Sequence, residues 1–353
     1  MPLTLPNSLF VANRITKVGD HDFRLSTSFR AALLHGSEVP LPTALALGGH
    51  SPIHDLPHLV VHLHRLLHHY LRLGHAQTMV ATLADVVIQG VQGNPDGYLA
   101  AMWMLPHDGM YTARHALHCA IMAALAGETL DFEAQVTHEL VCAALTMNVG
   151  AASLHDEMNR QEGPPSTLQR QWLDMHPLVS AAMLRESGID DGVWHHAVLF
   201  HHERTDHGGY PFHLGSDDLP EHARLLRLLD SLNAKLMPRD YRARMSVKKA
   251  LGGTYGSQNE ALESQLAAIL IKRIGFYPPG SFVELSNGER ALVVQPSLNA
   301  GEPRVVVEHG SREVIETGGT GLSVIKSIPV AIDAARAARF ADFWRNSHSV
   351  QST

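Results

Sequence analysis

The sequence predicts a mainly α protein, in which an irregular N-terminal segment precedes a helical bundle and a small β unit follows it. Apolar residues recur at the three- and four-residue spacing of helices through most of residues 55–275. Beyond residue 276 the pattern changes to alternation around an Asn-Gly pair, which is typical of a β-hairpin. Hydrophobic residues make up 45% of the 353 residues and charged residues 18%, a globular composition that supplies a large core.

The N-terminal part of the chain has the weakest periodicity. Residues 1–53 alternate prolines, glycines and short apolar runs, and we expect at most one or two short strands there. A first helix is predicted from Asp55, which can cap it, with Pro57 in its first turn. This helix should run to Leu73, because Gly74 interrupts the apolar spacing.

The central region alternates helical patterns with breaks that are rich in glycine and proline. The predicted helices cover residues 77–91, 96–104, 112–126, 131–147, 167–187, 191–202, 219–236 and 258–274. Together they predict a bundle large enough to hold its own core.

The last part of the chain predicts strands followed by one helix. We expect the strands within residues 276–327, with a hairpin turn at Asn287-Gly288, and a closing helix over 330–344. The predicted division is an N-terminal segment with a His-rich helix over 1–95, a helical domain over 96–275, and a β unit with its closing helix over 276–353.

Charge and cysteine content narrow the class of protein. The 28 Lys and Arg against 35 Asp and Glu give a net charge of −7, which argues against a broad surface for a nucleic-acid polymer. Two cysteines, Cys119 and Cys142, are too few for a disulfide framework and fit a reducing compartment. The N-terminus lacks a basic stretch followed by an unbroken apolar core, and no window of about 18 residues is wholly apolar. We therefore expect a cytoplasmic protein without a membrane span.

The 25 histidines are the unusual feature of the composition. Within the helical region they gather in YTARHALH, which holds His115, in MHPL, which holds His176, and in FHHERTDHGGYP, which holds His201 and His202. Asp230 follows on a later predicted helix. Neutral imidazoles and carboxylates together bind first-row divalent cations, and facing helices can bring them into a bundle core.

The order and spacing of these residues resemble the HD-GYP family of bacterial metal-dependent phosphodiesterases. The most specific piece is HHERTDHGGYP, which is similar to the HHE…DGxGYP loop of the family, and the resemblance covers about residues 97–275. It implies a helical HD-superfamily bundle that hydrolyses cyclic dinucleotides, chiefly cyclic di-GMP, with two or three metals, commonly iron or manganese. The stretch YPPGSFVELSNGERALVV is also similar to the short β extension that follows many such domains.

Position by position, the resemblance implies a set of metal ligands and a set of substrate contacts. The implied metal ligands are His115, His176, His201, His202 and Asp230. The implied substrate-binding residues are Arg239 and Arg242, which match basic positions that contact phosphate, and Gly209, Tyr210 and Pro211 of the signature loop. The two arginines stand in a basic run on an otherwise acidic chain, a pattern typical of a local anion site.

The His-Asp pair that names the superfamily is absent. The segment LTMNVGAASLHDEM aligns with the family's LLHDIGKIGIPDEI and places Met147 at the histidine, Asn148 at the aspartate and Ala151 at the lysine. The nearby pairs His107-Asp108 and His155-Asp156 do not fall in register, so we do not count them as replacements.

Losing this pair removes the chemistry of a two-metal centre. Two divalent cations about 3.5–4 Å apart share anionic bridges and water, and the uncharged amide of Asn148 cannot replace a bridging carboxylate. The thioether of Met147 is a poor ligand for hard divalent cations, and Ala151 removes a charge that could position phosphate. His207 in place of a loop glycine and Asn233 in place of a second late aspartate point the same way.

We therefore expect one divalent transition metal, iron, manganese or zinc, on His176, His201 and His202, and no dinuclear centre. The leading hypothesis is a degenerate HD-GYP-like protein of cyclic di-GMP signalling. It would bind the dinucleotide or a signalling partner, with hydrolysis lost or much reduced. Two alternatives stay open: an active phosphodiesterase with a mononuclear site, and a scaffold that binds neither metal nor nucleotide.

A second group of histidines lies in and beside the first predicted helix. It comprises His54, His58, His62, His64, His68, His69 and His75. The first three are spaced by four and share one stripe of the helix. We interpret this stripe as a solvated side or one that faces a second copy of the chain in a homodimer. A metal patch and a pH-sensitive contact are the alternatives. Cys119 and Cys142 are interpreted as buried packing residues.

Overall fold

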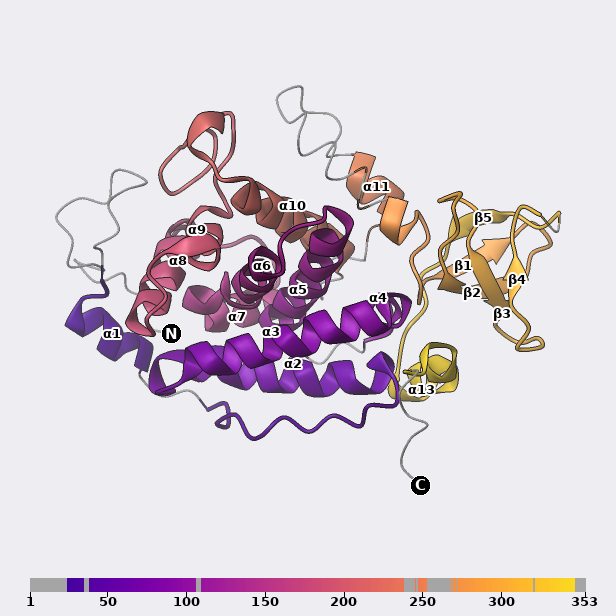
Figure 1. The fold of residues 1–353 in the computed structure, drawn as a ribbon, viewed down its shortest axis with the longest axis horizontal. Helices are drawn as coiled ribbons and strands as arrows, with labels where there is room; N and C mark the ends of the chain where they lie inside the picture. The colour runs from indigo at the N-terminus through magenta and orange to yellow at the C-terminus, as the bar shows by residue number, and fades with distance from the viewer. Residues whose placement is uncertain are drawn as a thin grey trace.

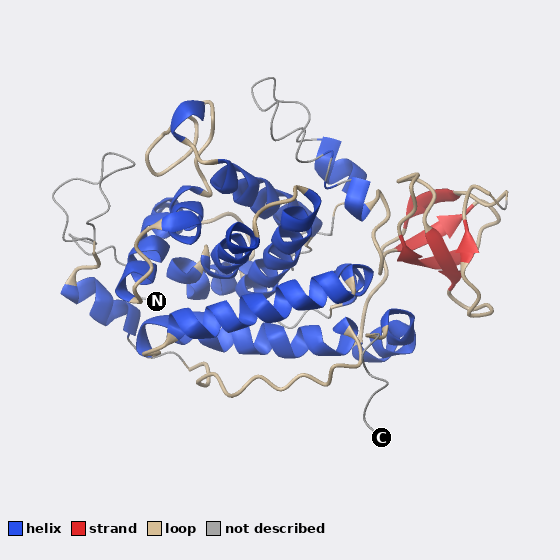
Figure 2. Cartoon of the chain, in the orientation of Figure 1, coloured by secondary structure: helices blue, strands red, loops and turns tan. Residues whose placement is uncertain are grey.

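In a computed structural model, the residues described are 24–34, 38–105, 109–237, 245, 247–252, 268, 270, 272–319 and 321–346. Their helices are α1 (Thr27–Leu34), α2 (Pro52–His69), α3 (Ala76–Gly93), α4 (Pro95–Met104), α5 (Tyr111–Thr129), α6 (Ala134–Thr146), α7 (Ala152–Arg160), α8 (Thr167–Glu186), α9 (Gly192–Phe200), α10 (Glu221–Leu236), α11 (Val247–Gly252) and α13 (Ala334–Phe340). Short 3₁₀ turns are η1 (Tyr70–Arg72), η2 (Val149–Ala151), η3 (Ser216–Asp218) and η4 (Ala341–Trp344). The strands are β1 (Phe282–Leu285), β2 (Arg290–Gln295), β3 (Arg304–Val307), β4 (Ile315–Glu316) and β5 (Val324–Ser327). The prediction of a mainly α bundle followed by a small β unit is confirmed (Figures 1 and 2).

Helix α5 is the centre of the bundle. Its side chains are buried continuously from Tyr111 to Gly127, which places this helix in the interior of the bundle. It packs against α2, α3, α6, α7 and α10, which surround it (Figure 1). One hydrophobic core therefore extends from Leu56 of α2 to Leu229 of α10. None of the described helices has the length and apolar character needed to cross a membrane.

The start of α2 differs from the prediction. The helix begins at Pro52 because Ser51 caps it, with its hydroxyl accepting a hydrogen bond from the Ile53 amide at 3.3 Å. Asp55, the predicted cap, is buried within the first turn. There its Oδ1 accepts hydrogen bonds from the amides of Gly48 and Gly49, at 2.9 and 3.2 Å. The Asp55 cap was therefore wrong, and this carboxylate instead holds the preceding loop against the helix.

Three described helices, α1, α7 and the short α11, were not predicted, and one predicted helix lies mostly outside the described residues. Helix α1 forms in the region where strands were expected, and it buries Phe29 against Trp172 with ring centroids 5.3 Å apart. Helix α7 contains the second half of the segment LTMNVGAASLHDEM. Its mostly polar sequence hides the helical spacing, although Leu154 and Asp156 are buried. The helix expected over 258–274 is described only near its end.

The β unit is a five-stranded antiparallel sheet in the order β4-β3-β2-β1-β5. The predicted hairpin at Asn287-Gly288 joins β1 to β2, with Val283 opposite Ala291. The closing helix α13 begins later than predicted, because Asp333 caps it. At its end Trp344 donates from Nε1 to the carbonyl of Val294 in β2 at 2.9 Å, which ties the last helical turn to the sheet.

The β unit meets α4 so closely at Gly280 that only glycine fits. An added Cβ there would lie 2.6 Å from the carbonyl oxygen of Ala100, and φ is +84°. Gly288 is a matched control, because it has a φ of +85° but no atom within 4 Å of an added Cβ. We predict that Gly280→Ala lowers the free energy of unfolding by about 1–3 kcal/mol more than Gly288→Ala, measured by urea denaturation. Equal losses in the two variants would contradict this contact.

Candidate functional site

Three histidines from two neighbouring helices form a buried donor group. His176 lies within α8, whose start is fixed by a capping box between Ser166 and Gln169. His201 and His202 follow directly after α9. The Nε2 atoms of His176 and His201 are 3.1 Å apart, and donor atoms of all three histidines lie within 4.8 Å of one another.

Backbone carbonyls decide which ring nitrogens face each other. Nδ1 of His176 donates to the carbonyl of Leu173 at 2.6 Å, and Nδ1 of His201 donates to that of Val198 at 2.7 Å. A carbonyl can only accept, so both Nε2 atoms carry lone pairs when the rings are neutral. Burial lowers the pKa of His176, His201 and His202, which keeps these rings neutral at pH 7.

Two lone pairs that face each other repel unless a cation lies beside them. Zinc binds imidazole nitrogen at 2.0–2.1 Å, and a tetrahedral ion with such bonds sets neighbouring donor atoms about 3.3 Å apart. The 3.1 Å separation of the two Nε2 atoms is close to this distance between neighbouring donors. Three neutral imidazoles also suit zinc and iron chemically. The donor set therefore fits one divalent transition metal.

The other two residues predicted as ligands, His115 of α5 and Asp230 of α10, bond directly to each other. His115 donates from Nε2 to Oδ1 of Asp230 at 2.7 Å, and Sγ of Cys119 lies 3.7 Å from the same nitrogen. Burial opposes a charge on His115, but the acidic groups of Cys119, Tyr111 and Asp230 outweigh it and raise the pKa of His115 well above its ordinary value. Burial would also raise the pKa of Asp230, but His115 and the other histidines lower it. At neutral pH the two residues form an imidazolium–carboxylate pair.

The two groups are neighbours, since the charge of Asp230 also acts on the histidine pair after α9. The structure thus brings together all the residues predicted as metal ligands. It adds Cys119, which lies with His115 and Asp230 in a second three-donor group. Burial raises the pKa of the Cys119 thiol, and Asn233 donates a hydrogen bond to its sulfur at 3.5 Å. The four-residue spacing from His115 to Cys119 on one helix was the sequence signal for this residue.

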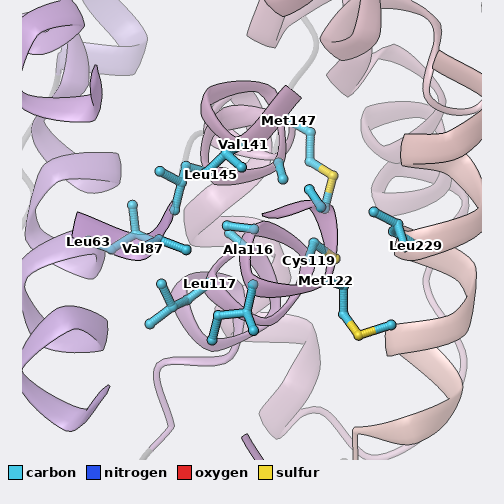
Figure 3. Packing of buried hydrophobic residues seen from close by; sticks show 14 of the residues in the cluster. Leu63, Val87, Ala116, Leu117, Cys119, Met122, Val141, Leu145, Met147 and Leu229 are labelled. Atoms are coloured by element: carbon cyan, nitrogen blue, oxygen red, sulfur yellow. The ribbon is translucent and has the colours of Figure 1, made fainter. Parts of the chain in front are cut away.

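The three positions that the sequence analysis aligned with the family's histidine, aspartate and lysine are buried. Met147 is fully buried and belongs to the apolar cluster drawn in Figure 3. Asn148 is 5% exposed, and Ala151 is fully buried. His155, which is out of register with the family motif, nonetheless places its ring edge on His176, with centroids 5.6 Å apart. The thioether of Met147 therefore fills space in the apolar core.

A buried carboxylate folds the signature loop. Glu203 is 1% exposed and accepts hydrogen bonds from the amides of Phe212 and Leu214. Gly209 packs beneath it so tightly that an added Cβ would lie 2.3 Å from the backbone nitrogen of residue 204. The glutamate of the HHE motif is therefore a scaffold for the loop, and the glycine is required by space.

The folded loop brings Tyr210 to the three histidines. Its ring stacks on His202 with centroids 4.7 Å apart, and its amide donates to the His202 carbonyl at 3.2 Å. Burial raises the pKa of Tyr210, so its phenol stays protonated. Pro211 follows in the same turn. His207 has a φ of +60°, a conformation that favours the glycine found there in the family, and its Nδ1 donates to the His213 carbonyl at 3.0 Å.

Part of the predicted site lies outside the described residues. Arg239 and Arg242, the predicted phosphate contacts, are among these positions, as are His107 and Asp108. Lys235, which begins the basic run, is described, and its Nζ donates to the carbonyl of Ala250 at 3.4 Å. This contact joins the end of α10 to α11.

Comparisons with known proteins agree with this arrangement. Residues 105–259 match the HD domain family. The chain is 26% identical over 248 residues to the cyclic di-GMP phosphodiesterase PA4108 of Pseudomonas aeruginosa, an alignment that covers 68% of this chain and 59% of that protein. It is 24% identical over 154 residues to the cyclic di-GMP phosphodiesterase response regulator RpfG of Xanthomonas campestris pv. campestris, covering 43% of this chain and 40% of RpfG. The chain therefore spans less than two thirds of the length of either relative.

A solved structure shares the fold. Bd1817, an HDG"Y"P protein from Bdellovibrio bacteriovorus, superposes with a TM-score of 0.52 and 13% sequence identity. The superposition covers 64% of this chain and 74% of that one. At this level of identity the likeness concerns the fold.

The three buried histidines predict how stability depends on pH in the metal-free protein. Their pKa values are lowered in the folded state, so below about pH 6.5 the unfolded chain takes up protons that the folded chain does not. Stability should therefore fall as the pH drops below about 6.5, by up to about 1.4 kcal/mol per pH unit for each histidine. His115 acts in the opposite direction near pH 6.5: its raised pKa keeps it protonated in the folded chain, while the unfolded chain still takes up this proton as the pH falls. The comparison of variants below cancels this contribution, because His115 is present in each of them.

Urea denaturation of the chelator-treated chain at pH 7.5 and 5.5 measures this effect. We expect His176→Gln to lose about 1 kcal/mol less over this interval than the unchanged chain. His58→Gln, at an exposed position of α2, should leave the pH dependence unaltered. An unaltered pH dependence in His176→Gln would show that this ring is not buried and neutral.

Proposed function

Because the chain belongs to the HD-GYP family of HD-domain proteins, we propose that it acts in cyclic di-GMP signalling in the bacterial cytoplasm as a degenerate member. It holds one divalent transition metal and binds cyclic di-GMP, and its hydrolytic activity is lost or much reduced. Both curated relatives described above are named cyclic di-GMP phosphodiesterases, which supports the choice of ligand. The observation that carries the proposal is the compact three-histidine donor group, together with the uncharged, buried side chains of Met147 and Asn148.

The three histidines would hold the metal through nitrogen atoms that already carry lone pairs. His176 and His201 keep their rings oriented by donating from Nδ1 to backbone carbonyls, the usual support for metal-bound histidine. When bound, the metal supplies positive charge and Lewis acidity next to a phosphate. Tyr210 covers one face of His202 and keeps a protonated phenol beside this group. Arg239 and Arg242 supply the phosphate contacts that the family resemblance implies.

The second donor group explains why binding need not lead to turnover. Two cations held close together need anionic bridges, and Asn148 supplies none. The nitrogen and oxygen atoms of His115 and Asp230 that a second metal needs are already joined at 2.7 Å in an ion pair. A second metal would have to break this pair and also remove a proton from His115. This cost favours the mononuclear state.

One observation favours a second candidate, an active metal-dependent phosphodiesterase. Cys119 joins His115 and Asp230 in a three-donor group whose atoms lie within 4.8 Å of one another, next to the three histidines. A thiolate there would supply one negative charge, the same as the carboxylate of a His-Asp pair. Burial raises the pKa of the Cys119 thiol, which opposes this state in the metal-free protein.

Calorimetry and a hydrolysis assay on the metal-loaded full chain test the proposal. We expect saturable heat with cyclic di-GMP and no cleavage of the dinucleotide in the presence of Mn²⁺. Replacing both Arg239→Ala and Arg242→Ala should weaken binding at least about 100-fold, because two charge-assisted contacts are lost. The control is Arg304→Ala with Lys326→Ala, two exposed β-unit cations whose partners are exposed glutamates. It should bind like the unchanged chain.

Each alternative gives a different result in the same experiment. Turnover that His201→Ala abolishes would establish the phosphodiesterase and overturn the degenerate assignment. No heat with either the unchanged chain or the arginine variant would favour the scaffold that binds neither metal nor nucleotide.

A further inference from the structure

A second cluster of metal-binding side chains joins α2 to the HD bundle. Nε2 of His68 lies 3.1 Å from Oδ2 of Asp156 in α7, and Nδ1 of His64 lies 3.5 Å from the same oxygen. His64 and His68 are four residues apart on α2, so their rings stand on one face with centroids 4.4 Å apart. Donor atoms of the three residues lie within 4.8 Å of one another.

These distances match the geometry of a small tetrahedral cation. Bonds of about 2.0–2.1 Å from zinc to nitrogen and oxygen set neighbouring donors about 3.3 Å apart. The two measured separations, 3.1 and 3.5 Å, lie on either side of that value. Two imidazoles and one carboxylate are a common protein donor set for zinc and for ferrous iron.

The carboxylate is oriented by a shell of hydrogen bonds. Oδ1 of Asp156 accepts from the amide of Thr112 at 2.8 Å and from its hydroxyl at 3.0 Å, which leaves Oδ2 directed at the two histidines. Burial would raise the pKa of Asp156, but the hydrogen bonds from His68 and Thr112 lower it, so the carboxylate stays ionised. On the other side of His68, Nδ1 lies 3.4 Å from the hydroxyl of Ser153. Such outer contacts orient ligands in metal sites.

Solvent can reach the edge of the cluster on the Ser153 side of His68. His68 and Ser153 line a cavity of about 90 Å³ that also borders Arg72. This volume holds water, since one water needs about 10–15 Å³ of such space. The side chains of His64, His68 and Asp156 are 17%, 9% and 7% exposed, so the group is shielded but reachable.

We infer that His64, His68 and Asp156 form a binding site for a divalent first-row cation of the zinc class, separate from the three-histidine group. A cation there cross-links α2, in the N-terminal part of the chain, to α7 of the HD bundle. The residues around this site also neighbour the donor groups of the first site. Thr112 precedes His115 by one helical turn, and the neighbour of Asp156, His155, packs on His176. A cation bound here therefore stabilises the helices that carry His115 and His176.

Zinc titration of the chelator-treated full chain, by competition with a chromophoric chelator, tests the site. His64→Gln with His68→Gln should bind one zinc fewer per chain, both alone and in a background carrying His201→Gln. The matched control is His54→Gln with His58→Gln, which removes two exposed histidines with the same spacing on the same helix. This control should retain the full stoichiometry.

Asp156→Asn provides a second, milder test. The amide keeps an oxygen that can accept from Thr112 but loses the anionic donor. Zinc affinity of this site should then fall at least about 10-fold, the lower end of what outer contacts alone contribute. Hydrogen exchange adds a readout of the cross-link: zinc should slow exchange of the α2 amides in the unchanged chain and in the His54/His58 control, and not in the His64/His68 variant.

The inference is overturned if the His64/His68 variant, folded by circular dichroism, binds as much zinc as the unchanged chain. Should that variant fail to fold, Asp156→Asn decides, and a zinc affinity within twofold of the unchanged value overturns the site. Both outcomes are independent of whether cyclic di-GMP binds.

Discussion

The lone pairs of two buried imidazoles, held 3.1 Å apart, are the constraint on which the rest of the site depends. Carbonyls of the chain's own helices take the Nδ1 protons of His176 and His201, so neither ring can turn its lone pair away without losing a hydrogen bond. Burial removes the water that would otherwise solvate these nitrogens, and it disfavours the protonated rings. A metal cation satisfies both nitrogens at once.

The charged side chains next to the three-histidine group neutralise each other. Met147 and Asn148, which the sequence alignment proposes at the positions of the family's histidine and aspartate, are both uncharged and buried, and Met147 packs in the apolar core. The carboxylate that remains, Asp230, is matched by a protonated His115. One negative charge thus meets one positive charge without a second metal. A buried ion pair of this kind is stable only when both partners are present.

Much of the helical architecture could be predicted, because apolar spacing reports directly on which faces are buried. The long helices from α3 to α10 lie close to their predicted bounds, and the hairpin at Asn287-Gly288 is where the turn residues indicated. The failures have local causes. Ser51 and Asp55 are both good caps, and only the position of the preceding loop decides between them. Helix α7 was missed because its polar residues serve contacts with other helices rather than a simple apolar face.

The candidate site was predictable where the family motif is contiguous and was missed where residues meet only in space. HHE and GYP identified the three-histidine group, whereas Cys119 was interpreted as packing. On α2 the regular four-residue spacing of His54, His58 and His62 was the pattern visible in the sequence. The cluster with a carboxylate is formed instead by His64 and His68, since Asp156 comes from α7, far along the chain. No local pattern contains that information.

Anomalous diffraction at the metal absorption edge, from crystals of the full chain grown with manganese or zinc, tests the central claim most directly. The account predicts a single anomalous peak at the candidate functional site, from one metal ion bound by His176, His201 and His202. The ion pair of His115 and Asp230 should be intact. A second peak bonded to His115, Cys119 and Asp230, about 3.5–4 Å from the first, would contradict it.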